Sequence, residues 1–350
     1  MIGLVLSGGG VKGAYQVGSY FAFKKCHIKI DGIVGCSIGS FNAAMIAAKK
    51  EKELLKFWHS VSISTLLGFS EKFSEKYNKK EFDIDFFKEG IESLNKIINE
   101  KGIDTTALEN ILNELNLEKH LRKSKIVYGL STFRLSDKKA LELFIDDMKE
   151  GSLNNYIMSS CFLPVFKPKK YEDDSFYLDG GFADYMPYNM LLNKGYDKVY
   201  CIDLKAPGVY KIPIDKDKIE VISPSKNLGS MLSLDDDKID ENIKLGYYDT
   251  LKVLKKLDGK KYIFKKKKDK FYKKLVKNIN PEIIDTAKIF LKEDAEKWLV
   301  IKAVEYLMEK ENLTYFKIYN IGELIKKYQK NNDSFIINLF IKNLNTSIFF

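Results

Sequence analysis

The chain has 350 residues, of which 45% are hydrophobic and 30% are charged, a balance that excludes a disordered or fibrous protein. Its formal net charge of +10 is uneven, because residues 252–277 contain 13 lysines and two aspartates. No apolar run reaches the roughly 18 residues that cross a bilayer, and no secretory signal is visible. The four cysteines lack metal-binding spacing, so we expect reduced core residues and a cytoplasmic protein.

The first 50 residues predict two strand–helix pairs. Residues 2–6 (IGLVL) are a short apolar run, typical of a strand buried in a parallel sheet, and apolar residues at helical spacing follow over 13–25. Residues 32–35 (GIVG) predict a second strand, which leads through Cys36 and Ser37 into an alanine-rich helix. This order of elements predicts an α/β fold.

The rest of the chain divides into three predicted parts. Residues 61–120 are polar with helical periodicity and predict a helical insertion. Strand patterns return after it, and we expect the sheet to continue to about residue 225, followed by an almost wholly helical pattern. We therefore predict an α/β domain over residues 1–255, which carries the insertion, and a helical C-terminal region over residues 256–350, lysine-rich at its start.

Three glycines follow the first strand in the spacing G-x-G-x-x-G, which is typical of a dinucleotide-binding loop: Gly8, Gly10 and Gly13. Such a site also needs an acidic residue at the end of the second strand, about 20 residues further on. Asp31 precedes that strand instead, and the strand ends in residues 35–39, which read GCSIG. A nucleotide-binding module is therefore the weaker alternative.

The GCSIG motif between a strand and a helix predicts a nucleophile elbow. Its flanking residues Gly35 and Gly39 permit the strained turn that holds the Ser37 hydroxyl clear of the backbone. Attack on an ester leaves an oxyanion, which amides at a helix N-terminus can stabilise. The neighbouring strand is followed by three glycines that offer such amides, Gly8, Gly9 and Gly10. Together, the two strand ends predict an ester-cleaving site.

A nucleophilic serine needs a base, and histidine is the usual one. The chain has three histidines, His27, His59 and His120, and their polar surroundings are typical of surface residues. We therefore expect a carboxylate, and the best candidate is Asp179, which ends an apolar stretch and is followed by Gly180. The alternative is that Asp179 serves only a turn, because Asp-Gly is common in hairpins.

These motifs together resemble those of the patatin-like phospholipases, particularly their bacterial stand-alone members. The motifs of that family are G-G-G-x-[RK]-G, G-x-S-x-G and D-G-[GA]. They correspond, in the same order, to residues 8–13, 35–39 and 179–181 of this chain. A weaker similarity extends over about residues 1–255, whereas the last 95 residues show none of comparable quality.

The resemblance implies a three-layer α/β/α fold and a Ser-Asp dyad, with Ser37 as nucleophile and Asp179 as base. It also implies an oxyanion hole formed by the amides of Gly8–Gly10, and chemistry that needs no metal or cofactor. Lys12 stands where arginine is more usual, which keeps the charge but loses the planar fork of donors.

The function implied by the resemblance is hydrolysis of fatty acyl esters of phospholipids or lysophospholipids through an acyl-serine intermediate. Transfer of the same acyl group to an alcohol or a lysolipid is an open alternative, because water and another acceptor compete for one intermediate. The acyl position and the head group are not specified by these motifs.

Residues 252–277 raise the question of a membrane partner. Tyr262, Phe264, Phe271 and Tyr272 are interleaved with lysines there, a composition typical of a segment that lies on an anionic bilayer. A solvated lysine face is the open alternative, and nucleic acid is not expected because no recognised binding motif accompanies the charge. Under the first interpretation, Lys252 to Lys277 make the protein peripheral to a membrane.

Overall fold

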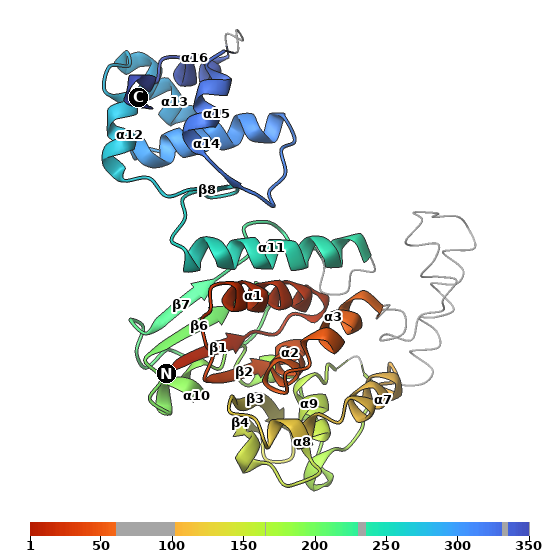
Figure 1. The fold of residues 1–350 in the computed structure, drawn as a ribbon. Helices are drawn as coiled ribbons and strands as arrows, with labels where there is room; N and C mark the ends of the chain where they lie inside the picture. Colours follow the sequence, from red (N-terminus) through yellow and green to blue (C-terminus); the bar gives the residue numbers. More distant parts are fainter. Residues whose placement is uncertain (61–101, 165, 230–235, 331–334, 350) are drawn as a thin grey trace, which may run out of the picture. The chain divides into compact units, whose positions relative to one another are not determined.

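The computed structural model describes residues 1–60, 102–164, 166–229, 236–330 and 335–349 (Figure 1). They divide into two compact units, Met1–Tyr247 and Tyr248–Phe350. The division falls within helix α11 (Asp236–Leu254), whereas the sequence analysis set its domain boundary after residue 255. Most of the predicted helical insertion, residues 61–101, lies outside the described residues.

The first unit is built on one mixed sheet, in the strand order β4-β3-β2-β1-β6-β7, with β5 pairing with β3 beside this path. The strands are β1 (Ile2–Leu6), β2 (Gly32–Cys36), β3 (Val127–Arg134), β4 (Lys139–Phe144), β5 (Tyr177–Leu178), β6 (Lys198–Ile202) and β7 (Ile219–Ile222). The pairs β1-β2, β1-β6, β2-β3 and β6-β7 are parallel, and β4 and β5 run antiparallel to β3. The predicted α/β sheet is therefore confirmed.

Helices lie on both faces of this sheet (Figure 1). In the first unit they are α1 (Ala14–Lys25), α2 (Ile38–Ala47), α3 (Glu51–Ser60), α7 (Thr106–Leu115), α8 (Leu117–Leu121), α9 (Leu153–Ser160) and α10 (Tyr188–Asn193). On one face Phe23 of α1 meets Tyr200 of β6, with ring centroids 5.1 Å apart. On the other face Leu191 of α10 shares a buried cluster with Val5 and Val34. Alternate residues of a strand point to opposite faces, which gives the three predicted layers.

The register of the sheet brings two loops together at the carboxyl ends of β1 and β2. Leu6 is paired with Gly35, so the residues that follow each strand lie side by side. A Cβ atom added to Gly8 would lie 3.3 Å from Ser37 Cβ. The first turn of α2 passes directly over the end of β1, because a Cβ atom on Gly39 would lie 2.2 Å from Leu6 O. A larger residue than glycine therefore has no room at position 39.

The C-terminal unit is mostly helical, as predicted. After α11 it contains α12 (Asp269–Val276), α13 (Pro281–Leu291), α14 (Glu296–Lys310), α15 (Ile321–Tyr328) and α16 (Ile336–Lys342). A short parallel pair, β8 (Ile263–Phe264) and β9 (Ile318–Tyr319), was not predicted, because two-residue strands are too short to show an alternating pattern. Across the described part of the chain, no helix has the length and apolar character required to cross a bilayer.

The aromatic residues of the lysine-rich segment belong to the core of this unit. Tyr262, Phe264 and Tyr272 are fully buried, and Phe271 packs against the same cluster. The expectation that these rings join the lysines at a membrane surface is therefore wrong. A segment that lies on a globular core also alternates aromatic rings, which face the core, with lysines, which face solvent. The burial of these rings corresponds to that arrangement.

Candidate functional site

Ser37 occupies a sharp turn between β2 and α2. Its backbone angles, φ 54° and ψ −132°, are ones that residues with side chains rarely adopt. The Ser37 N–H donates to Ser160 Oγ at 2.9 Å, and the Ser37 carbonyl accepts from both the N–H and the hydroxyl of Ser40, at 2.8 and 2.6 Å. These bonds hold the strained conformation, as the predicted elbow requires.

Asp179 follows β5 and begins the short 3-10 helix η4 (Gly180–Phe182). It is 5% exposed, and its Oδ1 accepts from the Gly181 amide at 2.8 Å, so the predicted turn function of this residue is present. Its buried Oδ2 has no partner with full hydrogen-bond geometry. The Ser37 hydroxyl is nevertheless near enough to this carboxyl to lower its pKa as a hydrogen-bond donor. Oδ1 thus serves the turn, and Oδ2 is the oxygen without a partner among the described residues.

Burial dominates the acid–base behaviour of Asp179. Removal from water disfavours the carboxylate and raises the pKa of Asp179 from its ordinary value to about 6, while donation from Ser37 and from the Gly181 amide lowers the pKa by a smaller amount. A carboxyl with this pKa is ionised at pH 7 and is a much stronger base than an exposed aspartate.

Two close contacts fix the turn that carries Asp179. The Asp179 N–H donates to Phe162 O at 2.7 Å, which ties the turn to the segment after α9. A Cβ atom on Gly180 would lie 2.3 Å from Ser131 O of β3 and 3.1 Å from Cys36 Sγ. Only glycine permits this approach, so Gly180 sets how near the turn comes to the end of β2.

The glycine loop lies on the other side of Ser37. None of the amides of Gly8, Gly9 and Gly10 donates a hydrogen bond to another residue that the structure describes. Gly9 and Gly10 have φ angles of 153° and 58°, which favour glycine, and the 3-10 helix η1 (Gly10–Gly13) starts here. Unpaired amides at a helix start, next to Ser37, are suited to an anionic oxygen.

A buried polar network anchors the glycine loop to three helices. Gln16 donates to Ser7 O at 2.7 Å, and Asn42 donates to Gly13 O at 3.0 Å and to Gln16 Oε1 at 2.9 Å. Trp58 in turn donates to Asn42 Oδ1 at 3.0 Å. The sequence analysis missed this network, because single polar residues on apolar helices carry no signal of mutual contact.

Ser160, at the end of α9, is a second residue that the sequence analysis missed. Its Oγ accepts from the Ser37 N–H at 2.9 Å and donates to Ser131 O at 2.8 Å, so one buried hydroxyl joins the elbow to β3. A serine at the end of an apolar helix was the only available signal, and it does not specify the partner.

A family model described as patatin-like phospholipase matches residues 4–192, more than half of the chain. The chain belongs to the patatin-like phospholipase family. A lysophospholipase of Aspergillus terreus is 24% identical over 204 residues, and one of Phaeosphaeria nodorum is 26% identical over 204 residues. Each match covers 58% of this chain, which spans only 12% of the length of these curated relatives.

Solved structures also resemble the chain. VipD from Legionella pneumophila aligns with a TM-score of 0.45 and 15% identity, covering 97% of this chain and 83% of that one. The type III effector protein ExoU aligns with a TM-score of 0.37 and 10% identity, covering 97% of this chain and 73% of that one.

The three motifs of the family meet at the carboxyl edge of the sheet. Gly8 adjoins Ser37, Ser37 lies near enough to Asp179 to lower the pKa of that carboxyl, and Gly180 packs against the end of β2. Gly13 lies at the base of the loop, where an added Cβ atom would come within 2.9 Å of Ile38. Lys12 of the same loop has no ion pair with any residue that the structure describes.

The residues weighed as alternatives lie elsewhere. The three histidines are exposed, and His59 pairs with Asp240, with 3.2 Å between Nδ1 and Oδ1. Asp31, the acid considered for a nucleotide, accepts a hydrogen bond from the Ile2 amide at 2.8 Å at the amino end of β1, whereas the glycine loop follows the carboxyl end of that strand. It is therefore not available to bind a ribose at the carboxyl edge. No cluster of metal-ligating side chains occurs among the described residues.

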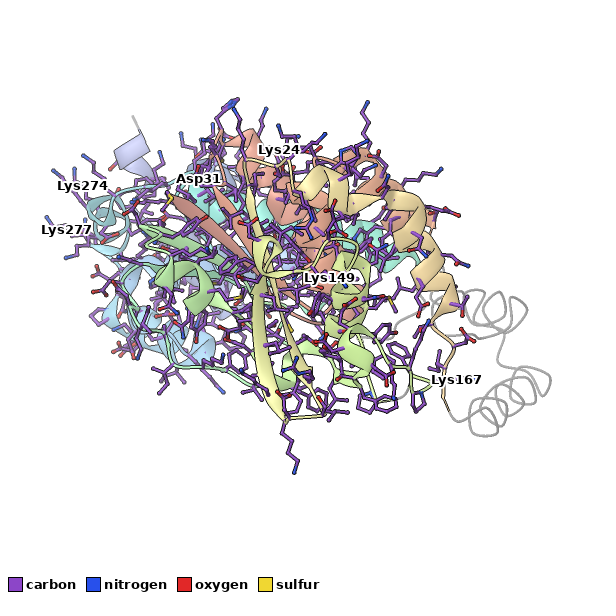
Figure 2. All side chains as sticks on the ribbon, turned by 90° about the horizontal axis from the view of Figure 1, so that it is seen from below. Lys24, Asp31, Lys149, Lys167, Lys274 and Lys277 are labelled. Atoms are coloured by element: carbon purple, nitrogen blue, oxygen red, sulfur yellow. The ribbon has the colours of Figure 1, made fainter. Side chains whose placement is uncertain are left out.

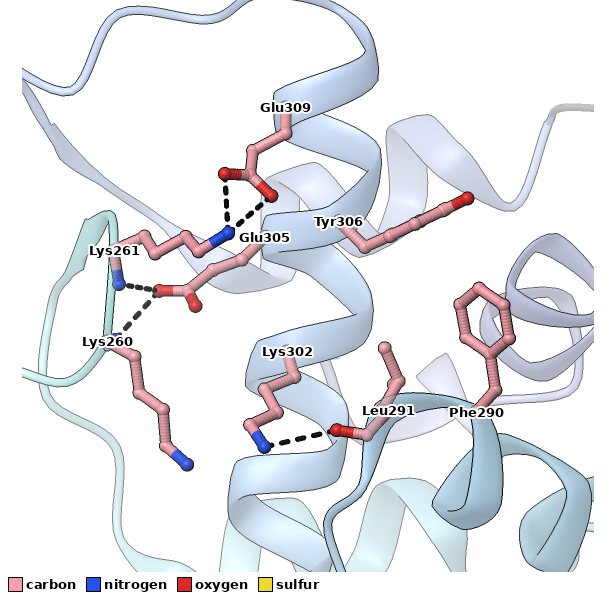
Figure 3. A pocket seen from close by; sticks show the side chains of 8 residues that line it. All are labelled: Lys260, Lys261, Phe290, Leu291, Lys302, Glu305, Tyr306 and Glu309. Carbon is pink, nitrogen blue, oxygen red and sulfur yellow. Dashed lines mark hydrogen bonds and ion pairs between the residues drawn. The ribbon is translucent and has the colours of Figure 1, made fainter. Parts of the chain in front are cut away.

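The C-terminal unit contains a pocket of about 350 Å³ that holds none of the predicted site residues (Figure 3). It is lined by Lys260, Lys261, Phe290, Leu291, Lys302, Glu305, Tyr306 and Glu309. Lys260 and Lys302 pair with Glu293 at 2.7 and 3.1 Å, and Lys261 pairs with Glu309 at 2.7 Å. The lysine charges are thus compensated within the unit, and the pocket offers no free anion site.

Proposed function

We propose that this protein hydrolyses fatty acyl esters of phospholipids or lysophospholipids through an acyl-serine intermediate. The observation that carries the proposal is a serine on a strained turn, Ser37, between the buried carboxyl of Asp179 and the unpaired amides of Gly8–Gly10. Membership of the patatin-like phospholipase family and the lysophospholipase names of its relatives support a lipid substrate.

Each residue has one step in the proposed mechanism. Ser37 Oγ attacks the acyl carbonyl carbon while Asp179 accepts the hydroxyl proton, and the amides of Gly8–Gly10 stabilise the oxyanion. Asp179 then returns the proton to the departing alcohol as the carbon–oxygen bond of the ester breaks. Water, activated by Asp179, cleaves the acyl-serine and releases the fatty acid. No metal or cofactor takes part in these steps.

A direct assay tests the hydrolase against its alternatives. We expect free fatty acid when the purified protein is incubated with phosphatidylcholine or lysophosphatidylcholine. Added lysolipid or alcohol that captured most of the acyl group would instead identify an acyltransferase. Tight binding of NAD together with the absence of any ester turnover would contradict the proposal and favour the nucleotide-binding module.

Ser160→Ala is expected to lower kcat for ester hydrolysis by about tenfold or more with little change in KM, because the position of the nucleophile depends on this bond. Loss of the hydroxyl also leaves the Ser37 amide and Ser131 carbonyl unpaired, so the free energy of unfolding should fall by about 1–3 kcal/mol. Rescue of kcat by Ser160→Thr would support the positioning function.

Ser159→Ala is the matched control for Ser160→Ala. The Ser159 hydroxyl donates to Asn155 O at 2.8 Å within α9, and it has no hydrogen bond to a predicted site residue among the described residues. We expect the kinetic constants of this control to stay within about twofold of the wild type, since it changes only a helix-internal bond. A Ser160→Ala protein with wild-type kcat would rule out the positioning function.

We also propose that lysines of residues 252–277 attach the protein to anionic membranes by electrostatic attraction. Between residues 265 and 277, seven lysines are exposed and have no ion pair among the described residues: Lys265, Lys266, Lys268, Lys270, Lys273, Lys274 and Lys277. We call these seven residues the lysine face. Lys274 and Lys277 extend outward from the ribbon (Figure 2). Since the aromatic rings of the segment are in the core, the contact is one of charge without insertion.

The triple variant Lys270→Gln, Lys273→Gln, Lys274→Gln should bind anionic vesicles about 100-fold more weakly at low salt, at about 1 kcal/mol per lysine. A matched control replaces three exposed lysines of the first unit, Lys25, Lys52 and Lys56, with glutamine. Vesicle co-sedimentation at two salt concentrations measures both. Equal binding by the two variants would contradict a specific function of the lysine face.

A further inference from the structure

Large apolar side chains are exposed on two segments beside the catalytic candidates. Phe182 of η4 is 47% exposed, and the loop between β6 and β7 exposes Val209, Tyr210 and Ile212 at 49%, 53% and 82%. We call these four residues the apolar rim. Full exposure of an apolar side chain forgoes about 1.5–3 kcal/mol of burial, so a group of them next to a site indicates a surface that meets an apolar partner.

Backbone hydrogen bonds join the two segments of the apolar rim next to Asp179. The Val209 N–H donates to Gly181 O at 2.8 Å, and the Tyr185 N–H donates to Val209 O at 2.7 Å. The Gly181 amide also donates a hydrogen bond to Asp179 Oδ1. Phe182 therefore belongs to the turn that carries the proposed base, Val209 is bonded to that turn, and Tyr210 and Ile212 follow one and three residues further along the loop.

Contacts on the inner side of the loop hold its shape. The Tyr185 hydroxyl donates to Asp203 Oδ1 at 3.1 Å and accepts from the Ala206 N–H at 2.9 Å. A Cβ atom on Gly208 would lie 2.6 Å from Tyr185 Cβ, so the loop backbone rests on this ring. Further along, Asn189 donates to Ile212 O at 2.9 Å. The apolar rim is thus presented on a well-anchored backbone.

The composition of the loop fits a lipid surface. Residues 204–214 read LKAPGVYKIPI and contain two lysines and no acidic residue, in a chain that is 30% charged. Lys205 pairs with Asp203 at 3.0 Å and Lys211 pairs with Glu142, so both lysine charges are compensated and the exposed part of the loop is mainly apolar. Such a surface suits the acyl region of a bilayer. A soluble protein partner would require only apolar complementarity, whereas a lipid substrate must bring its ester to Ser37 along this same edge.

We propose that the apolar rim docks on the surface of a phospholipid bilayer and inserts its side chains among the acyl chains beside Ser37 and Asp179. This inference rests on the proposed function and specifies the physical form of the substrate, a lipid aggregate and not a dissolved monomer. The contact differs from that of the lysine face: it depends on apolar burial, so it acts on neutral lipid and resists salt.

The test uses Phe182→Ser, Val209→Ser, Ile212→Ser as one triple variant of the full chain. Tyr210 is kept because its ring packs on Tyr185, with 4.9 Å between centroids. We expect binding to neutral phosphatidylcholine vesicles to fall at least about tenfold at both low and high salt, because apolar burial is lost. Hydrolysis of vesicle phospholipid should fall in parallel, and turnover of a short-chain soluble ester should not change.

Val221→Ser is the matched control, since Val221 on β7 is 48% exposed, like Val209. We expect this control to bind vesicles as the wild type does. Undiminished vesicle binding by the triple variant would overturn the proposal. So would conversion of a dimer into a monomer at unchanged vesicle binding, which would identify a self-association surface.

A second variant keeps the inference testable if the triple variant does not fold. Ile212→Trp adds an indole ring at the most exposed position of the apolar rim. The fluorescence emission of this tryptophan should shift to shorter wavelength when neutral vesicles are added. An unshifted spectrum on vesicles would overturn the docking. Absence of soluble-ester turnover in the wild type would contradict the hydrolase function, and it would leave the vesicle-binding result to be judged separately.

Discussion

Ser37→Ala is expected to lower kcat for hydrolysis of a soluble ester by about 10³–10⁶-fold while the protein stays folded. The reason is that, in the proposed mechanism, Ser37 Oγ attacks the ester beside the Asp179 carboxyl and the glycine amides, and an alanine offers no nucleophile. The residual rate comes from the amides alone. The measurement is steady-state kinetics with a chromogenic ester, together with circular dichroism.

Covalent labelling gives the same prediction a second readout. A fluorophosphonate should modify the wild type on the peptide that contains Ser37, and the Ser37→Ala protein should not react. A folded Ser37→Ala protein with full turnover or full labelling would end the proposal, because another nucleophile would then be required.

Ser37→Gly separates loss of chemistry from loss of structure. Glycine adopts φ 54° and ψ −132° without steric cost, so this variant should be as inactive as Ser37→Ala and yet more stable than it, by about 1 kcal/mol in the free energy of unfolding. Urea unfolding measures the difference. A less stable Ser37→Gly protein would argue against strain at the elbow.

Asp179→Asn is expected to reduce kcat/KM by at least about 10³-fold, because an amide cannot accept the Ser37 proton. The wild type should show kcat/KM rising through pH 6 and level above it, since burial raises the pKa of Asp179 to about 6 and the base acts as the carboxylate. The variant should lose this rise. Steady-state kinetics of both proteins from pH 4.5 to 8 with a soluble ester measure the two kcat/KM profiles. A wild-type profile without a rise near pH 6 would contradict the prediction.

The same substitution should change stability in a pH-dependent way. The folded pKa of Asp179 lies above its unfolded value, so folding is most favourable when the group is protonated, and that stability is lost as the pH rises through about 6. Asp179→Asn should therefore be more stable than the wild type by about 1–3 kcal/mol at pH 8 and show little difference at pH 4.

An exposed carboxyl nearby gives the control for this stability change. Asp174 pairs with Lys170 at 2.7 Å on the surface, and Asp174→Asn should leave the free energy of unfolding almost unchanged at either pH. An Asp179→Asn protein that was less stable than the wild type at pH 8 would show that burial of this carboxylate is not costly.

Much of the α/β unit was predictable because its signals are local. A strand of continuous apolar residues, a tight turn and a helix follow from sterics and hydrophobic pattern among near neighbours, so Ile2–Leu6, Gly32–Cys36 and the Ser37 turn were located from a few residues each. The glycines at positions 8 and 39 were recognisable for the same reason. The motifs also named Asp179, although no local rule states how near it comes to Ser37.

Contacts across long stretches of chain were not readable in this way. Ser160 reaches the Ser37 amide across 123 residues, and the turn of Asp179 meets the Val209 loop through backbone atoms that carry no sequence signature. Burial has the same non-local origin. Burial placed Tyr262 and Phe264 in the core of the C-terminal unit, although their sequence pattern was also compatible with a membrane surface. Burial also raised the pKa of Asp179 to about 6. Burial depends on all the residues that pack around a group, so it is established only when the chain has folded.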